Sequence, residues 1–262
     1  MRRLATITAA LLLVAPVAGA QGRESDRSFR WEGTVASGNW LYVRNLNGSI
    51  RVDRATGNRV EVTAEKTWRR GNPDDVRIEV TERRGNVIVC AIWLDVTECD
   101  EDGYDVRRRG RRNDNNDVAV EFTVRLPQGV RLGVSTVNGA LDISGATSTV
   151  EANTVNGEVT ATSSGGPVQA STVNGGIEVR MGELGEGDLE FSTVNGSIEV
   201  YVPERGLNAE VEMRTVNGRV GSDFPLTVQG RINPRRIRAT IGSGGRRIEL
   251  STVNGSVELR RR

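Results

Sequence analysis

The tetrapeptide Thr-Val-Asn-Gly occurs six times in this chain of 262 residues, and that repetition constrains the fold more than any other feature. Self-similarity at a nearly constant period is the signature of a repeat architecture. The last two copies begin at 215 and 252, 37 residues apart, close to two of the earlier periods, which predicts one degenerate copy near 231–236. The copies lie at 136–139, 154–157, 172–175, 193–196, 215–218 and 252–255, with a relaxed copy, NLNGSIRV, at 45–52.

The residues that flank each copy alternate between apolar and polar. In LEFSTVNGSIEV, Leu189, Phe191 and Thr193 share one face, and Ile198 and Val200 continue an apolar face beyond the turn. A period of two is typical of strands that bury one face, and the intervening glutamates then point to water. Each period is expected to hold two short strands and two turns, which predicts an all-β protein.

Two arrangements fit this pattern. In a β-solenoid each period of about 18 residues is one coil, its strands pair in parallel with the coils above and below, and equivalent asparagines stack into a hydrogen-bonded ladder. In an antiparallel β-meander, Asn-Gly instead closes a two-residue hairpin. Stacking demands the same residue at the same place in every coil, so the near-identity of the motif favours the solenoid.

The motif also predicts which residues form the turns. Both residues of Asn-Gly tolerate positive φ, and glycine does so without steric cost, so we expect that conformation there. The predicted turn and ladder residues are Asn47, Gly48, Asn138, Gly139, Asn156, Gly157, Asn174, Gly175, Asn195, Gly196, Asn217, Gly218, Asn254 and Gly255.

Three stretches together carry a resemblance to a known family. They are TVRLPQGVRLGVSTVNGALDISG, the run of Thr-Val-Asn-Gly copies, and the ending GSDFPL…IGSGGRRIELSTVNGSVEL. Over about residues 28–262 they resemble the DUF4097 family, bacterial exported proteins described as "putative adhesins". The resemblance implies a right-handed β-solenoid, and it implies no established reaction, cofactor or catalytic residue.

Residues 1–20 are typical of a secretory signal peptide. A basic start, MRR, precedes an apolar stretch that is too short and too rich in alanine to favour a membrane anchor, and Ala18 and Ala20 form an A-x-A cleavage site. We therefore expect export of a single solenoid domain, 21–262, to the periplasm, the cell surface or the medium.

Within that domain, 28–60 is expected to form the N-terminal cap and first coil, 91–117 a surface loop, and 130–262 the regular repeats. A solenoid must cover its open ends, because an unpaired edge strand recruits other strands. Trp31 and Trp40 are candidates to pack over the N-terminal end or to offer a platform to sugar rings.

The predicted loop carries the remaining candidate site. An even number of cysteines in an exported chain favours one disulfide, here between Cys90 and Cys99. Acidic side chains in the loop offer oxygen ligands for calcium, although Gly103 comes too early for an EF-hand, and the arginine run could meet phosphate or an acidic polysaccharide. A solvated charge run explains the same residues. The candidates are Asp100, Asp102, Asp105, Arg107, Arg108, Arg109, Arg111 and Arg112.

The chain contains no histidine, which excludes Ser-His-Asp and Cys-His nucleophilic sites and histidine metal sites. Carboxylate pairs of the glycosidase kind would be common on a face where acids recur in every coil, and this regularity argues against one privileged pair. With 35 Lys and Arg against 34 Asp and Glu, the net charge of +1 gives no sign of a nucleic-acid partner.

These observations predict a non-enzymatic exported protein of the envelope or cell surface. It would be an adhesin-like scaffold that binds an unidentified surface polymer or envelope protein through a solenoid face. No cofactor, no nucleic-acid partner and no membrane-spanning segment in the mature chain are expected. The alternatives are a structural or assembly element of the envelope and a β-helix enzyme that acts on polysaccharide.

Overall fold

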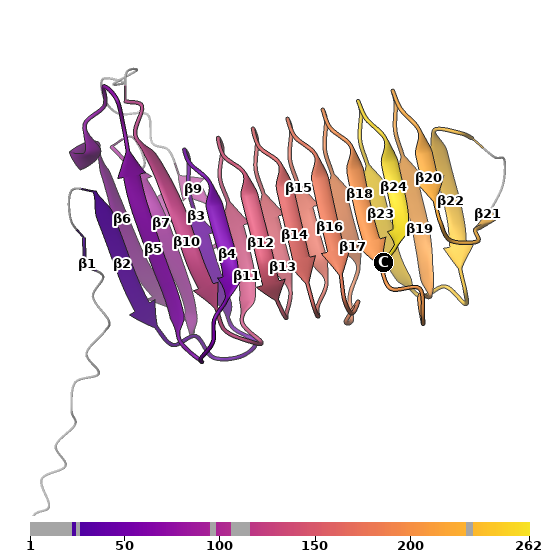
Figure 1. Ribbon diagram of the computed structural model, residues 1–262, viewed down its shortest axis with the longest axis horizontal. Helices are drawn as coiled ribbons and strands as arrows, with labels where there is room; N and C mark the ends of the chain where they lie inside the picture. Colours follow the sequence, from indigo (N-terminus) through magenta and orange to yellow (C-terminus); the bar gives the residue numbers. More distant parts are fainter. Residues whose placement is uncertain (1–22, 25–26, 95–97, 106–115, 229–232) are drawn as a thin grey trace, which may run out of the picture.

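The computed structural model describes residues 23–24, 27–94, 98–105, 116–228 and 233–262. Figure 1 shows an elongated molecule in which strands run across the long axis in two layers. The predicted signal peptide, 1–20, lies outside the described residues. The all-β expectation is confirmed, because a single 3-10 turn, η1 (Pro73–Asp75), accompanies the described strands.

Two sheets of 11 strands each form the body of the described chain, and β8 (Glu98–Cys99) with β9 (Tyr104–Asp105) makes a small third one. Sheet 1 holds, in spatial order, β1 (Arg23–Glu24), β2 (Ser28–Gly33), β5 (Val60–Thr67), β10 (Ala119–Leu126), β4 (Ile50–Arg54), β12 (Leu141–Ala146), β14 (Val159–Ser163), β16 (Ile177–Met181), β18 (Ile198–Val202), β24 (Val257–Arg261) and β20 (Val220–Ser222). Sheet 2 holds β21 (Thr227–Val228), β22 (Arg236–Ile241), β19 (Ala209–Arg214), β23 (Arg246–Ser251), β17 (Leu189–Ser192), β15 (Val168–Ser171), β13 (Val150–Asn153), β11 (Arg131–Ser135), β3 (Trp40–Arg44), β7 (Asn86–Trp93) and β6 (Val76–Arg83).

Each repeat contributes one strand to each sheet, and equivalent strands of neighbouring repeats pair in parallel. β12 pairs with β14 so that Leu141 lies beside Val159, and β14 pairs with β16 so that Val159 lies beside Ile177. These side chains point between the sheets and are at most 2 % exposed. Stacking of equivalent residues therefore builds one continuous apolar core, because the strands of these repeats bury their alternate side chains against the other sheet.

The alternative of an antiparallel meander is wrong for these repeats. The strands before and after each Asn-Gly lie in different sheets, as β11 in sheet 2 and β12 in sheet 1 do. They are joined by a corner and not by a hairpin, and their hydrogen-bonding partners belong to the neighbouring repeats.

The spatial order of the repeats departs from the chain order at the C-terminal end. After β19 and β20 the chain reverses through β21 and β22, and β22 pairs antiparallel with β19. β23 and β24 then return between β17–β18 and β19–β20. The prediction of a degenerate copy of the motif near 231–236 is therefore wrong for 233–236, because these residues form a turn that leads into the antiparallel strand β22. Residues 231 and 232 lie outside the described residues.

The N-terminal end is rearranged in a similar way. β3 and β4 lie between the later strands β7 and β10 on one side and β11 and β12 on the other. The antiparallel strands β6, in sheet 2, and β2 with β5, in sheet 1, cover this end. Trp31 of β2 is only 2 % exposed and belongs to the core, whereas Trp40 lies on the outer face of sheet 2, stacked on Tyr42 with 5.3 Å between ring centroids.

The segment predicted as a loop, 91–117, joins β7 to β10 at the corner where the other repeats have Thr-Val-Asn-Gly. Its first three residues, 91–93, belong to β7 instead, and Ala91 and Ile92 are buried. β7 pairs in parallel with β3 on one side and antiparallel with β6 on the other, so its backbone is held through Trp93.

Candidate functional site

The repeated asparagines form the predicted ladder along one corner of the molecule. The side-chain Nδ2 of Asn156 donates to Oδ1 of Asn138 at 2.8 Å, and Asn174 and Asn195 each donate to the preceding rung at the same distance. Asn254 then donates to Asn195, and Asn217 donates to Asn254. Asn254 is therefore an interior rung and Asn217 is the last one, in the order set by the returning strands.

The first asparagine of the series bonds differently. Asn47 pairs with Asn138 through the backbone, but its Nδ2 donates to the carbonyl of Val118 at 3.0 Å. Val118 ends the segment that replaces Thr-Val-Asn-Gly between β7 and β10, so the ladder passes from side chains to backbone where the repeat motif stops.

The threonine of each motif has a role that the sequence pattern did not reveal. Thr172 is 4 % exposed, and its Oγ1 donates to the carbonyl of Gly157 in the neighbouring repeat at 2.9 Å. The equivalent hydroxyls make the same bond at 2.8–3.0 Å, from Thr136, Thr154, Thr193, Thr215 and Thr252. A second ladder, buried beneath the asparagines, thus crosses every repeat boundary, since a buried hydroxyl must find a partner.

The expectation of positive φ at the Asn-Gly turns is mostly wrong. In the described residues only Arg84 among non-glycines has positive φ, and of the motif glycines only Gly48 and Gly255 do. The reason for glycine is close approach: a Cβ on Gly175 would lie 1.9 Å from the carbonyl oxygen of Gly157. Consecutive turns nest against one another's backbone, and a side chain would push them apart.

The valine of the tetrapeptide lies outside the core. The exposed fractions of Val155, Val173, Val194, Val253 and Val216 range from 38 % to 54 %. Three of the four motif residues therefore bond or pack between repeats, and the fourth faces solvent beside the asparagines. The motif is a corner-building element, and its side chains do not converge on a ligand.

The disulfide between Cys90 and Cys99 attaches residues 98–105, which we call the strap, to the outer face of sheet 2. Residues of β8 and β9 cover a second apolar cluster that includes Tyr42 and Ile92. The buried hydroxyl of Tyr104 donates to the carbonyl of Ala91 at 2.7 Å, and burial raises the pKa of this phenol. The strap is thus part of a small apolar core of its own.

Arg44 lies beneath this strap without a carboxylate partner among the described residues. Its guanidinium stacks over Tyr42, donates to Oγ of Ser135 at 3.1 Å and donates to the carbonyl of Glu101. Its Nε has no partner, and burial lowers the pKa of the guanidinium. Arg44 ties the strap to sheet 2 by hydrogen bonds and ring stacking.

The structure describes only some of the candidate site residues in the predicted loop. Oδ1 of Asp100 accepts from the amides of Asp102 and Gly103, so this carboxylate closes the turn between β8 and β9. Asp105 ends β9 beside Glu98. In the described part of the chain no three Asp, Glu, Cys or His side chains gather as a metal site requires. Arg107, Arg108, Arg109, Arg111 and Arg112 lie outside the described residues.

The outer face of sheet 1 carries a continuous line of polar side chains, which we call the sheet 1 row. Its members are neighbours from strand to strand and alternate with buried residues along each strand, so all of them face solvent. In spatial order they are Arg125, Asp53, Ser144, Thr162, Arg180, Tyr201 and Arg260. At about 4.8 Å per strand the row extends roughly 30 Å across the sheet.

Tyr201 stands near one end of this row between two arginines. The guanidinium of Arg180 lies 4.0 Å from the centre of the phenol ring, and the Tyr201 hydroxyl donates to Glu199 at 2.9 Å. The hydrogen bond to Glu199 raises the pKa of Tyr201. Next to its last member, Arg260, the row therefore carries an oriented aromatic ring whose hydroxyl is held by Glu199.

On the outer face of sheet 2, Glu212 holds the C-terminal cap, which consists of β21 and β22. It accepts from Arg236 at 2.8 Å and from Arg238 at 3.3 Å, both on β22. Burial acts to raise the pKa of Glu212, but the hydrogen bonds from these arginines outweigh it and hold the pKa below its ordinary value. The cap is thus attached by a charged contact as well as by backbone pairing.

No described helix is long and apolar enough to cross a membrane. No curated protein matches the chain. Among solved structures, the chain is similar to a "putative cell adhesion protein" from Clostridium sporogenes ATCC 15579, with a TM-score of 0.54 and 8 % identity over 92 % of this chain and 100 % of that one. It is also similar to a "putative adhesin" from Bacteroides fragilis NCTC 9343, with a TM-score of 0.37 and 14 % identity over 91 % and 98 %.

The likeness to the Clostridium sporogenes protein shows a shared fold, which agrees with the stacked two-sheet architecture described above. The stretches that suggested a family from the sequence alone fall within the match to a family model, which covers residues 34–260. The chain belongs to the Toastrack DUF4097 family.

Proposed function

We propose that this protein is a non-enzymatic binding scaffold of the bacterial envelope or cell surface, adhesin-like in action, built as a right-handed β-solenoid with coils of about 18 residues. The binding face is the outer face of sheet 1, and the partner is an extended surface polymer. A solved structure of similar fold that is called a "putative cell adhesion protein" is in keeping with this role.

The sheet 1 row is the observation that carries the proposal. A polymer repeats its chemical groups at regular intervals, and a row of polar side chains at a constant spacing can contact several of them at once. Hydroxyls at Ser144 and Thr162, charges at Arg125 and Arg180, and an aromatic ring at Tyr201 provide the groups that bind saccharides. Because parallel strands in register hold the row, binding would require little ordering of the protein.

The proposal includes export. The predicted signal peptide and the Cys90–Cys99 disulfide both favour an oxidising compartment, whether periplasm, cell surface or medium. The side chains described on sheet 1 contribute hydrogen bonds, charge and stacking, so the proposed action is binding without turnover.

A panel of purified envelope and extracellular polysaccharides, immobilised and probed with the exported protein, tests this function. Thr162→Glu should abolish binding to any polymer that the native protein retains, because it adds charge and bulk in the middle of the row. Ser171→Glu on β15 is the matched control, since it makes the same charge change on the outer face of sheet 2, between the neutral side chains of Asn153 and Ser192. Equal retention of both variants, or no polymer bound by the native protein, would refute the proposed function.

A further inference from the structure

The three arginines of the sheet 1 row, and one arginine beside it, are already paired with carboxylates at no more than 3.6 Å. The pairs are Arg125 with Asp53, Arg180 with Glu178, Arg260 with Glu258 and Arg51 with Asp142. Opposite charges that lie a few ångströms apart largely cancel for a polymer lying over them, and salt screens the remainder. These arginines therefore offer little attraction to a negatively charged ligand.

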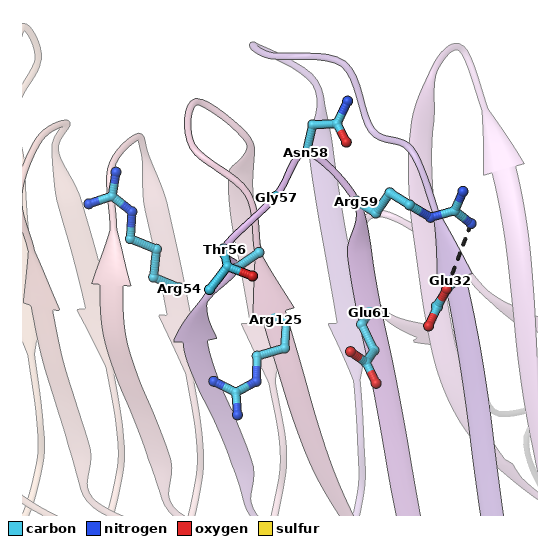
Figure 2. Close-up of a pocket in the computed structure, with 9 residues that line it drawn as sticks. Glu32, Arg54, Thr56, Gly57, Asn58, Arg59, Glu61 and Arg125 are labelled. Carbon is cyan, nitrogen blue, oxygen red and sulfur yellow. Dashed lines mark ion pairs between the residues drawn. The ribbon is translucent and has the colours of Figure 1, made fainter.

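The same pairing continues past the N-terminal end of the row, at a cleft of about 500 Å³. Arg30 lies 2.6 Å from Glu32 and 2.9 Å from Glu61. Figure 2 shows Arg59 reaching toward Glu32, to which it pairs at 3.8 Å, and Glu61 lies in register beside Arg125. Positive and negative side chains alternate here, so the cleft extends the paired surface and offers no separate site for an anion.

Next to the sheet 1 row lies a line of more acidic side chains, which we call the second row. In spatial order its members are Arg51, Asp142, Thr160, Glu178, Glu199 and Glu258. The last three are glutamates on neighbouring strands, about 4.8 Å apart, and Glu199 accepts from the Tyr201 hydroxyl. The two rows together contain one carboxylate more than they contain arginines. A polymer with many negative charges would therefore be repelled from this face.

The centre of the face carries hydroxyl groups without charge. Thr160 and Thr162 face outward from β14 and are half-buried, and within the described ranges neither hydroxyl has a hydrogen-bond partner. A hydroxyl both donates and accepts, which makes it complementary to the hydroxyls of a sugar. Two strands away, the ring of Tyr201 adds an apolar surface with a fixed orientation. The groups on this face that remain available to a ligand are thus neutral ones.

We propose that the sheet 1 row binds an uncharged polysaccharide, with Thr160 and Thr162 bonding to sugar hydroxyls and Tyr201 packing on the neighbouring part of the chain. The inference rests on the proposed function and names the class of polymer. Because recognition uses no net charge, binding should be nearly independent of salt. An acidic polymer held by arginines would instead be released as the salt concentration rises.

Retention of the exported protein on immobilised cellulose, chitin and curdlan, which are neutral, is compared with retention on the carboxymethyl derivative of each. At least one neutral polymer should retain the protein, and its carboxymethyl derivative should bind about tenfold more weakly or less. The affinity for the neutral polymer should change less than about twofold between roughly 0.05 and 0.5 M NaCl.

Removing the two central hydroxyls tests which side chains bind. The double variant Thr160→Val with Thr162→Val should weaken binding about tenfold, because valine keeps the shape of threonine and loses its hydrogen bonds. Thr81→Val, on the outer face of sheet 2, is the matched control and should leave the affinity unchanged.

Freeing one arginine tests the role of charge pairing. Glu178→Gln leaves Arg180 without its partner, so this variant should gain retention on the carboxymethyl polymers, and added salt should remove the gain. Glu190→Gln on β17 makes the same charge change on sheet 2, where it frees no arginine of the row, and should produce no gain.

Circular dichroism and melting of each variant show whether the fold is retained. The inference would be overturned by stronger retention on a carboxymethyl polymer or on cationic chitosan than on the neutral counterpart, by loss of the neutral polymer in salt, by an unchanged affinity in the double threonine variant, or by equal gains in the two glutamine variants. Retention on charged polymers alone would leave the proposed function standing, whereas retention on none of the polymers would refute both.

Discussion

Replacing Gly175 by alanine tests the reason for glycine in every motif. The new Cβ would lie 1.9 Å from the carbonyl oxygen and 2.5 Å from the carbonyl carbon of Gly157, both backbone atoms of the neighbouring turn. Ordinary contacts of this kind are about 3.5 Å, so the two turns would have to separate by roughly 1.5 Å. No rotamer change can relieve this contact, because neither partner is a flexible side chain.

The cost follows from the bonds between these turns. The Gly157 amide donates to the carbonyl of Asn174 at 3.0 Å, and the Thr172 hydroxyl donates to the carbonyl of Gly157 at 2.9 Å. A separation of about 1.5 Å breaks both, at about 0.5–1.5 kcal/mol each, and overpacking adds about 1–3 kcal/mol. We expect Gly175→Ala to lower the free energy of unfolding by about 2–6 kcal/mol.

The neighbouring glycine is the control. A Cβ on Gly176 would meet nothing closer than the carbonyl oxygen of Ser197 at 3.5 Å, which is ordinary contact. Gly176→Ala should therefore change stability by less than about 1 kcal/mol, in the stabilising direction, because alanine restricts the unfolded chain. Urea unfolding followed by far-UV circular dichroism measures both. Midpoints within experimental error of each other would refute close approach as the reason for glycine.

Four further outcomes are expected. Thr172→Val should cost about 0.5–1.5 kcal/mol by urea unfolding while Thr172→Ser costs less, since only serine retains the hydroxyl; equal losses would contradict a role for that bond. Asn254→Ala should cost about twice as much as Asn217→Ala, because Asn254 has a ladder bond on each side and Asn217 on one; the reverse ranking would contradict the order of the last repeats. The folded pKa of Glu212 is lowered, so its contribution to stability is present above the unfolded value near 4.5 and is lost as pH falls through the folded pKa; Glu212→Gln should flatten the acid limb of stability against pH, and an unchanged limb would count against the arginine contacts. Cys99→Ser should lower stability by about 2–4 kcal/mol, and mass spectrometry that finds two alkylatable thiols in the unreduced exported protein would exclude the bridge.

Several features of the fold could be predicted from the sequence, because they depend on residues that are close together in the chain. Alternation around Leu189 and Ile198 predicted strands with one buried face, because side chains of a strand alternate between its two faces. Near-identity of the motif predicted parallel stacking and the asparagine ladder, since a stack needs the same group at the same height in each repeat. The pairing of Cys90 with Cys99 followed from their number alone.

The candidate site could be predicted less well. The loop candidates were chosen for their charge, yet Asp100 closes a turn of the strap. Asp53 and Arg125 are far apart in the chain, and they are neighbours in the sheet 1 row because β10 pairs in parallel with β4. A row made of one residue from each of seven strands has no local signature, because register between distant strands places its members together.

Sequence by itself determined the repeat, the strand periodicity, the disulfide and the family of this protein, because each is written in residues that are near in the chain or identical between copies. Only the tertiary structure decided the order of the repeats. β23 and β24 return between earlier strands because the antiparallel strands β22 and β21 occupy the outer side of β19 in sheet 2. It also decided why glycine follows asparagine: the distance between stacked turns is set by hydrogen bonds across repeats, and it leaves no space for a Cβ.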